Sequence, residues 1–278
     1  MKMKKLLAGV FGLAASLTLV ACGQSASKEA ASDAWASIEK EGEITIGFDN
    51  TFVPMGFEDS SGKNVGFDID LATAVFDKYD ITIEWQPIDW DLKETELNNG
   101  KIDLIWNGYT ATDARRELVL FTESYMANEQ VLVTKKTSGI DTIEGMTGKK
   151  LGAQAGSSGY HVFAENPEIL KDLVDGADAT QYATFNEALI DLKNDRIDGL
   201  LIDRVYANYY LAQEGILDDY NVLVPGYAEE SFAVGARKSD KTLVDKINTA
   251  LKELYADGTF GDISDKWFGE DVAADGIK

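Results

Sequence analysis

The order of apolar and polar residues along the chain predicts short strands that alternate with helices. Three short runs rich in β-branched and aromatic residues are separated by two runs whose apolar residues recur at helical spacing. We expect strands at Glu43–Phe48, Ile81–Trp85 and Ile102–Trp106, and helices from Ile69 to Tyr79 and over Trp90–Leu97. This order of elements predicts an α/β fold with a mostly parallel sheet and helices on both of its faces.

A second set of similar elements begins at Leu151. A short strand there leads through a glycine-rich loop into a helical pattern. Farther along, Thr184–Glu187 fits a capping box that opens another helix, and the strand Ile197–Ile202 ends in Asp203. The second half of the chain is therefore expected to form α/β units of the same kind as the first.

A short internal repeat links the two sets. Leu, Asn, a cation, Ile and Asp occur in the same order in Leu97–Asp103 and, 95 residues later, in Leu192–Asp198. A repeat of this length can arise by chance in helix-turn-strand units, but here both copies lead into the most polar loops of the chain. The repeat favours two related α/β lobes that face each other.

Two acids lie near the start of the first expected helix, Asp68 and Asp70. A carboxylate in the first turn of a helix is stabilised by the positive end of the helix dipole. We expect both residues to stabilise this helix end and not to contact a ligand.

The first 21 residues predict a signal peptide. Three lysines among the first five residues precede the apolar run Leu6–Val20, which is too short for a well-made transmembrane span. Leu19-Val20-Ala21-Cys22 resembles the lipobox of bacterial lipoproteins, in which the cysteine becomes the lipidated first residue after cleavage. Two acyl chains of the palmitate type at Cys22 would anchor the protein stably, and residues 22–40 are expected as a flexible tether.

The composition changes the expected partners. The formal net charge is −22, and cleavage of the signal with its three lysines makes it −25. Such an acidic chain has no basic surface for nucleic acid, and its charge attracts cationic solutes. His161 is the only histidine and Cys22 the only cysteine, so we expect no catalytic residue, no metal ion and no cofactor.

The most informative segment is Asp103–Tyr125. A buried-looking apolar run ends there in the turn Asn107-Gly108, and hydroxyl groups and Arg115 follow within a few residues. Hydroxyls and a guanidinium at the carboxyl end of a strand are well placed to hold a small carboxylate. The segment predicts a protein that binds a free amino acid and performs no chemistry on it.

Four short motifs give a resemblance to a known family. The motifs are Gly66–Leu71, Thr110–Arg115, Asp257–Thr259 and Lys266–Gly269. With them, the chain from Gly42 to Gly269 resembles the family 3 bacterial extracellular solute-binding proteins, the receptors of polar amino-acid ABC importers. Phe76 and Tyr79 depart from the residues usual in the first motif.

The resemblance implies a two-lobed fold of the type II periplasmic-binding-protein kind, with two hinge crossovers. The crossovers would lie near Asn128–Leu132 and Pro225–Glu230. Lobe 1 would then comprise residues 41–127 and 228–278, and lobe 2 residues 128–227. The protein would be a monomer on the extracellular face of the cell membrane, held only by its lipid anchor, with an ABC permease as partner.

The resemblance also assigns ligand contacts. Arg115 corresponds to the residue that binds the ligand α-carboxylate, because a planar guanidinium matches two carboxylate oxygens. Asp203 corresponds to the residue that accepts the α-ammonium, helped by the Gly108 carbonyl. The other implied contacts are Thr110, Ser157 and Ser158 for the carboxylate, Phe52 and Trp90 as aromatic walls, and Asp49 at the distal end of the ligand side chain.

Several of these residues have a second interpretation. Ser157 and Ser158 also open a helix, where either can act as N-cap. Phe52 and Trp90 suit core packing equally well. An acid at Asp49 favours a cationic amino acid such as arginine, lysine or histidine, but Glu94 departs from the family pattern, and cystine or glutamine stays open as the ligand.

Two other classes of function are also open. A dehydratase-like enzyme could use the same cleft, although no catalytic partner set is apparent in the sequence. A sensor domain or adhesin is disfavoured because we expect no further domain or transmembrane helix after Lys278.

Overall fold

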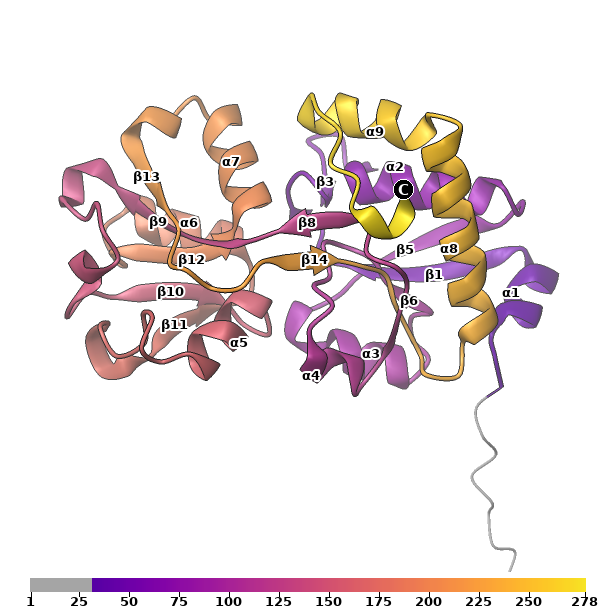
Figure 1. Ribbon diagram of the computed structural model, residues 1–278, viewed down its shortest axis with the longest axis horizontal. Coiled ribbons are helices and arrows are strands. Elements are labelled where there is room, and N and C mark those ends of the chain that lie inside the picture. Colours follow the sequence, from indigo (N-terminus) through magenta and orange to yellow (C-terminus); the bar gives the residue numbers. More distant parts are fainter. Residues whose placement is uncertain (1–31) are drawn as a thin grey trace, which may run out of the picture. The chain divides into compact units, whose positions relative to one another are not determined.

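The computed structural model describes residues 32–278, which form two five-stranded sheets flanked by helices (Figure 1). The helices are α1 Trp35–Glu41, α2 Phe67–Asp77, α3 Lys93–Asn98, α4 Asp113–Arg116, α5 Ser158–Glu165, α6 Phe185–Lys193, α7 Arg204–Gln213, α8 Lys241–Ala256 and α9 Thr259–Phe268. The strands are β1 Glu43–Phe48, β2 Thr51–Phe52, β3 Gly56–Glu58, β4 Asn64–Val65, β5 Thr82–Pro87, β6 Leu104–Ile105, β7 Leu120–Phe121, β8 Met126–Asn128, β9 Gln130–Lys135, β10 Leu151–Gln154, β11 Ala179–Tyr182, β12 Gly199–Asp203, β13 Tyr220–Leu223, β14 Glu230–Phe232 and β15 Gly235–Ala236.

The two sheets have the same strand arrangement. The first has the order β5-β1-β6-β15-β7 and the second β11-β10-β12-β9-β13. In each, the first three strands are parallel, and the fourth is antiparallel to both of its neighbours. Four strands of each sheet therefore run in one direction, and the expected α/β fold with mostly parallel sheets is confirmed.

The internal repeat coincides with equivalent elements. The helices α3 and α6 end 95 residues apart, as do the starts of β6 and β12. Asp103 stands before β6, and its N–H and Oδ2 make hydrogen bonds of 2.8 and 3.1 Å with the backbone of Thr45. Asp198 stands before β12 and makes two bonds of 2.8 Å with the backbone of Lys150 in the same way.

Two connecting strands lie side by side between the sheets (Figure 1). β8 leads toward β9, and β14 returns the chain to the first sheet; they pair antiparallel, with Glu230 opposite Asn128. After β14, β15 inserts between β6 and β7, and α8 and α9 pack against α2. The first sheet and its helices thus combine the two ends of the described chain.

The flexible tether expected as far as residue 40 is wrong for its last residues. Trp35–Glu41 forms α1, with Trp35 and Ile38 buried on one face. The Trp35 ring packs edge-on against Tyr79 at 5.0 Å between centroids. Two apolar residues at i and i+3 are enough to dock this short helix. The signal peptide, Cys22 and the first part of the tether lie outside the described residues.

One helix and one strand of the first lobe are shorter than the sequence predicts. The expected helix Trp90–Leu97 is divided into a 3₁₀ turn at Trp90–Leu92 and the helix α3. The expected strand Ile102–Trp106 pairs only at Leu104–Ile105, since Asp103 uses its side chain as well as its backbone to reach the neighbouring strand. Both differences lie next to the candidate site.

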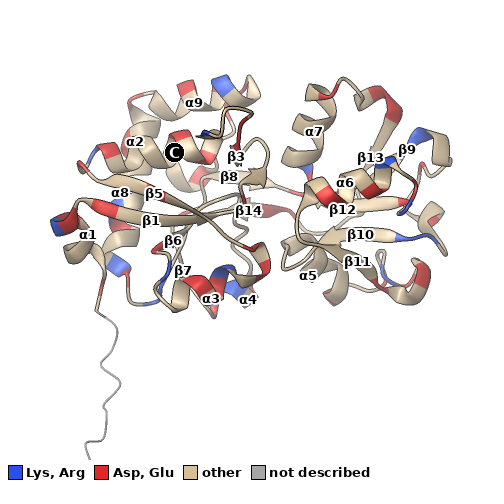
Figure 2. Cartoon of the chain, turned by 180° about the vertical axis from the view of Figure 1, so that it is seen from behind, with Lys and Arg blue, Asp and Glu red and all other residues tan. Residues whose placement is uncertain are grey.

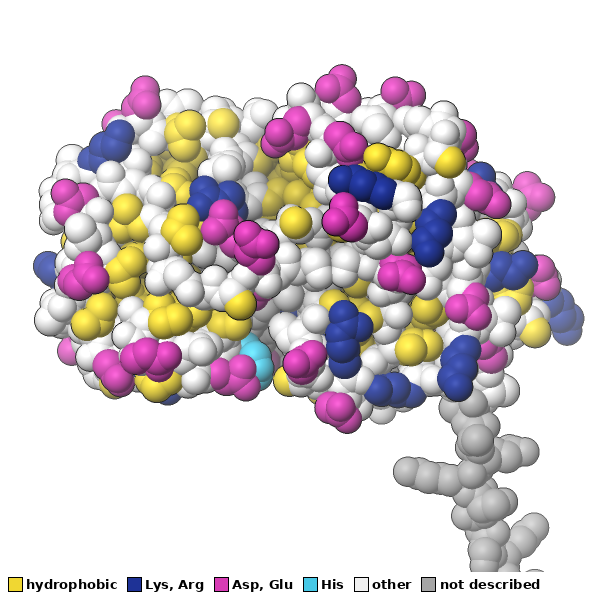
Figure 3. Space-filling model, in the orientation of Figure 1, with side chains coloured by type: hydrophobic (Ala, Val, Ile, Leu, Met, Phe, Trp, Pro, Cys, Tyr) yellow, Lys and Arg dark blue, Asp and Glu magenta, His cyan; other side chains and the backbone are white. Residues whose placement is uncertain are grey.

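On the face shown in Figure 3, acidic and basic side chains are interspersed with hydrophobic ones. Among the described residues, no helix is both long enough and apolar enough to cross a membrane.

Candidate functional site

Gly108 lies three residues beyond the end of β6, where the chain makes a turn that favours glycine. Its φ is +56°, and a Cβ added to it would lie 2.8 Å from Cε1 of Phe52. Its N–H donates a hydrogen bond of 2.7 Å to Oδ2 of Asp68. The turn that precedes Thr110 and Arg115 is therefore fixed from both sides.

Asp68 lies in the first turn of α2 as expected, but its side chain also contacts the turn at Gly108. Its side chain is fully buried and accepts hydrogen bonds from Gly108 N–H and, at 3.0 Å, from Tyr125 O–H. Burial raises the pKa of Asp68 to about 7, although these two donors oppose the shift. Asp70, by contrast, lies nearer the surface and pairs with Lys266 at 2.6 Å. Asp68 thus positions the loop of the candidate site.

Arg115 is buried, and two of its guanidinium N–H groups donate hydrogen bonds to backbone carbonyls. Nη1 donates to the Thr110 carbonyl and Nη2 to the Gly156 carbonyl, both at 2.9 Å. The guanidinium also lies 4.6 Å from the ring centroid of Tyr109. The acid Glu94 accepts a hydrogen bond of 2.8 Å from the Tyr109 hydroxyl and lies 3.8 Å from Nε of Arg115. Figure 2 shows the acidic side of α3 next to the basic side of α4.

A second buried cation, Lys93, lies beside Arg115 and was missed by the sequence analysis. Its Nζ donates to the carbonyls of Trp90 and Gly156, each at 2.9 Å. Burial, and next the charge of Arg115, lower the pKa of Lys93 to about 8. The lysine lies in a polar helix, where nothing in the spacing distinguishes it from an exposed residue. Two cations from the first lobe therefore meet one carbonyl of the second.

Asp203 is the last residue of β12 and is 5% exposed. Its Oδ1 accepts hydrogen bonds from the side-chain amides of Asn128 at 2.6 Å and Gln130 at 2.9 Å. Burial, and next the charge of Glu230, raise the pKa of Asp203 to about 7. Both amides come from the connecting strand β8 and from β9, so Asp203 is bound to the connection between the lobes.

Glu230, at the start of β14, was also missed. Its Oε2 accepts hydrogen bonds from Gln130 at 2.9 Å, Ser158 at 3.0 Å and Thr110 at 3.2 Å. Thr110 Oγ1 and Ser158 Oγ are themselves 3.1 Å apart. A continuous network therefore joins Arg115, through Thr110, to the carboxylates of the second lobe and the connecting strand. The predicted cation and the predicted anion lie in one buried network.

The two adjacent serines have different places. Ser157 is the N-cap of α5, and its Oγ accepts a hydrogen bond of 3.0 Å from Tyr160 N–H. Ser158 joins the network described above. The capping interpretation is confirmed for Ser157, and a ligand contact by either serine stays a prediction.

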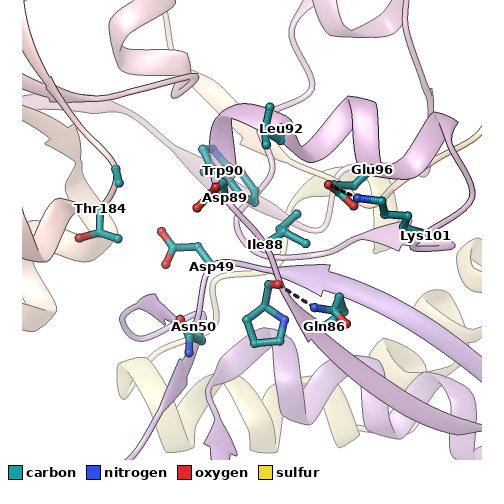
Figure 4. A pocket seen from close by; sticks show the side chains of 12 residues that line it. Asp49, Asn50, Gln86, Ile88, Asp89, Trp90, Leu92, Glu96, Lys101 and Thr184 are labelled. Atoms are coloured by element: carbon teal, nitrogen blue, oxygen red, sulfur yellow. Dashed lines mark hydrogen bonds and ion pairs between the residues drawn. The ribbon is translucent and has the colours of Figure 1, made fainter.

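Asp49 and Trp90 line a cavity of about 540 Å³ at the edge of this network. In Figure 4 the Asp49 carboxylate points into the cavity, with Thr184 of the second lobe across from it. Asp49 accepts hydrogen bonds from Thr51 and, at 2.8 Å, from the Gln154 amide; burial raises its pKa. Arg115 does not line this cavity. The cavity therefore lies beside Asp49 and Trp90, the residues expected to contact the ligand side chain.

Phe52 packs across to the second lobe. Its ring centroid lies 5.4 Å from that of Tyr206 and 5.8 Å from that of Phe185. The Tyr206 hydroxyl also donates to the Thr51 carbonyl at 3.2 Å. Phe52 is therefore buried and packed as a core residue is. Within residues 32–278, no group of three or more His, Cys, Asp or Glu side chains is arranged to hold a metal ion.

Comparison with known proteins assigns this chain to a family. Residues 44–270 match the bacterial extracellular solute-binding proteins, family 3, and the chain belongs to that family. It is 30% identical to the L-cystine-binding protein TcyA of Bacillus subtilis, covering 98% of this chain and 100% of that one. It is 31% identical to the arginine-binding extracellular protein ArtP of Bacillus subtilis, covering 96% and 98%. As expected, the family is one of receptors and not of enzymes, which removes the support for a dehydratase-like activity.

A solved structure provides a nearer relative. An ABC uptake transporter substrate-binding protein from Streptococcus pneumoniae, solved with bound histidine, is 69% identical, has a TM-score of 0.86 and covers 87% of this chain and 98% of that one. The two-lobed solute-binding fold of this chain agrees with that structure. Family members act outside the cytoplasmic membrane, as the sequence analysis expected.

Proposed function

We propose that this protein is an extracellular receptor that binds a free polar L-amino acid between its lobes and delivers it to an ABC importer. The observation that carries the proposal is the buried network in which Arg115 and Asp203 supply one positive and one negative charge. A zwitterionic ligand needs both charges, because an unpaired charge is costly to bury.

The carboxylate end of the ligand would bind at Arg115. The planar guanidinium can hold two carboxylate oxygens, and stacking on Tyr109 with Glu94 beside Nε keeps it oriented. Thr110 and Ser158 add hydroxyl groups from the two lobes, 3.1 Å apart. The ligand would exchange with the carbonyl contacts that Arg115 makes in this structure.

The ammonium end would bind at Asp203. Among the hydrogen bonds of the described residues, those to Asp203 all end on Oδ1 and leave Oδ2 as an available acceptor. The ligand side chain would extend toward Asp49 and the cavity beside Trp90. A carboxylate there suits an N–H donor such as imidazole or guanidinium.

Histidine is the first candidate ligand. The relative that is 69% identical was solved with histidine, whereas the relatives named for cystine and arginine are about 30% identical. The Asp49 carboxylate supports a side chain with an N–H group. Cystine and arginine remain the second candidates.

Closure of the two lobes on the ligand would be the signal that the importer recognises. A second relative, from Streptococcus thermophilus, is 64% identical but has a TM-score of only 0.58 over 88% of this chain. Chains this similar share local folds, so a different lobe placement would account for the lower score. The paired strands β8 and β14 would act as the hinge, with lobe 1 at residues 41–127 and 228–278, joined by α1, and lobe 2 at 128–227.

The lipid anchor at Cys22, the monomeric state and the permease partner belong to the same proposal. The lipobox-like sequence supports the anchor. Metabolic labelling of the protein with a palmitate analogue, compared with Cys22→Ser, tests it.

A thermal-shift screen with the twenty amino acids, cystine and ornithine tests the proposed function. We expect one or a few polar amino acids to raise the unfolding temperature, with histidine the strongest, because a ligand that binds only the folded state stabilises it. Isothermal titration calorimetry then measures the affinity. No shift with any of these compounds would refute amino-acid binding.

A further inference from the structure

We infer that Glu230, on the connecting strand β14, is the second carboxylate of the ammonium subsite, and that an amino acid entering this subsite displaces a proton. The inference rests on the proposed function and deepens it, since it specifies how the same site selects a cationic amine and how binding depends on pH.

The geometry brings two carboxylates onto the same pair of amide donors. Asn128 Nδ2 donates to Asp203 Oδ1 at 2.6 Å and lies 3.4 Å from Glu230 Oε2. Gln130 Nε2 lies 2.9 Å from each of these two carboxylate oxygens. An amide N–H₂ group has only two protons, and Gln130 also lies 3.3 Å from the Ser158 hydroxyl. Gln130 Nε2 therefore has three acceptors within reach and only two protons.

Each carboxylate keeps one oxygen for another partner. Glu230 Oε1 is buried and has no hydrogen-bond partner among the described residues. Asp203 uses only Oδ1 in its hydrogen bonds with the described residues. A buried acceptor without a donor costs free energy. A ligand ammonium, with three N–H donors, can serve both free oxygens at once.

The charges around the pair do not balance it. Arg115 on α4 is the cation that lowers the pKa of Asp203, and Glu230 on β14 raises it. The neighbouring β9 and α5 contribute the neutral Gln130 and Ser158, and β8 contributes the neutral Asn128. Arg204, next in sequence, is paired with Glu129 at 2.5 Å. The other buried cation, Lys93 on α3, lies beside Arg115 at the Gly156 carbonyl. The cation that acts on Asp203 is therefore the guanidinium that the proposed function assigns to the ligand carboxylate.

A proton is the remaining way to balance the pair. Burial, and next the charge of Glu230, raise the pKa of Asp203 to about 7, so near neutrality Asp203 is protonated for part of the time. When the ligand ammonium arrives, both carboxylates are needed as acceptors, and the proton leaves to solvent. Binding therefore strengthens as the pH rises through 7, up to a plateau. The charge of the subsite is the same before and after, with one ammonium in place of one proton.

Calorimetry of the wild type and of Glu230→Gln tests the inference. The probes are L-histidine, L-arginine and L-cystine, and measurements are made with whichever the wild type binds most tightly. Titrations in buffers of different ionisation enthalpy count the protons released. For the wild type we expect about 0.7 proton released at pH 6.5 and roughly a 20-fold gain in affinity from pH 5.5 to 7.5. Histidine also titrates in this range, so the difference between the two proteins is used.

For Glu230→Gln we expect an affinity about 10- to 100-fold lower at pH 7.5, because one of two buried acceptors loses its charge. The pH dependence should weaken and move to lower pH, because burial still raises the pKa of Asp203 but the charge of a second acid no longer does. The ratio of the two affinities should therefore shrink toward pH 5.5. A merely structural role would lower affinity equally at every pH. Glu229→Gln, at an exposed neighbouring position, is the matched control and should behave as the wild type.

The outcomes separate the two proposals. If the wild type binds a probe and Glu230→Gln has the same affinity, the same proton release and an unchanged unfolding temperature, the inference is overturned and the proposed function stands. If affinity rises in Glu230→Gln, Glu230 competes with the ligand carboxylate for Thr110 and Ser158, which also overturns it. If no probe binds to the folded wild type, the proposed function fails and the inference fails with it.

Discussion

In both lobes an aspartate stands immediately before the central strand and is hydrogen-bonded to the backbone of the neighbouring segment. In both lobes an ion pair also joins the end of the preceding helix to the residues that follow it. Each pair consists of a cation and an acid five residues earlier in the sequence. The pairs are Lys101 with Glu96 at 2.9 Å and Arg196 with Asp191 at 2.8 Å, again 95 residues apart. The two lobes therefore repeat one frame of local contacts.

The difference between the lobes lies beyond the ends of these strands. At the 95-residue offset, Gly108 of the first lobe corresponds to Asp203 of the second. The first strand end is a tight turn that leads to the cation Arg115, and the second is a buried carboxylate. The repeated scaffold thus carries unlike end groups, a guanidinium and a carboxylate within one network, and the proposed function assigns them to the two charges of a zwitterion.

The largest loss of ligand affinity is expected when the cation of the first lobe is removed. Arg115→Ala should weaken binding of L-histidine by about 4 kcal/mol, roughly a thousandfold, because a ligand carboxylate is left buried without its partner. Calorimetry at pH 7.5 measures the loss. Arg116→Ala removes an exposed neighbour and should leave the affinity unchanged. Equal affinity in Arg115→Ala and the wild type would remove Arg115 from the site.

The second-largest effect concerns Asp68, a buried acid of the first lobe, and the pH dependence of stability. Asp68 has its pKa raised to about 7 in the folded protein, so its contribution to stability is complete at low pH and is lost as the pH rises through 7. Between pH 5 and 8 the wild type should lose about 3 kcal/mol of its free energy of unfolding through this group.

Urea denaturation of the wild type and of Asp68→Asn at the two pH values measures this loss. The amide does not titrate, so this part of the pH dependence should disappear in the variant. Asp70→Asn, in the same helix, is the control and should keep the wild-type slope. Parallel pH curves for Asp68→Asn and the wild type would contradict a titrating Asp68.

Asp203→Asn tests the buried carboxylate at the strand end of the second lobe. It should weaken amino acids by about 2 kcal/mol, roughly 30-fold, because the acceptor of the ammonium loses its charge. Binding of the des-amino analogue, imidazolepropionate for histidine, should change much less. Competition calorimetry gives both numbers, and equal losses for the two compounds would rule out contact with the ammonium.

The smallest effect concerns the shared frame itself. Asp103→Ala and Asp198→Ala should each lower the free energy of unfolding by about 1 kcal/mol through lost hydrogen bonds, with ligand affinity unchanged. The first should cost more, because Asp103 also pairs with Arg237 at 2.8 Å. Urea denaturation compares them. A destabilisation confined to one of the two variants would show that the repeat is not energetically equivalent.

The sequence predicted the elements whose signal is local. The strand Glu43–Phe48 and the helix α2 have clear periodicity, and they occur almost as expected. The helix α1 was missed because its apolar face consists of two residues that follow a Ser- and Ala-rich stretch. This helix is stabilised by packing against Tyr79, a contact that the periodicity of apolar residues does not predict.

The candidate site could be predicted only in part, for a similar reason. Asp203 is the last residue of an apolar strand, and Arg115 lies in the polar segment that follows another, where residue type and position point to a ligand. Asn128 and Glu230 lie in strands of three residues each, too short to show an alternating pattern. Their importance arises from the pairing of these strands, which joins segments about one hundred residues apart. A local pattern contains no trace of that pairing.

The insertion of β15 between β6 and β7 has a consequence for secretion. A chain is synthesised from its amino end, and the first sheet must wait for residues 235–236 before β7 has a neighbour. The second sheet is complete once Leu223 has emerged. We therefore expect the later lobe to mature before the earlier one, so that the newly exported polypeptide assembles in the reverse of its order of synthesis.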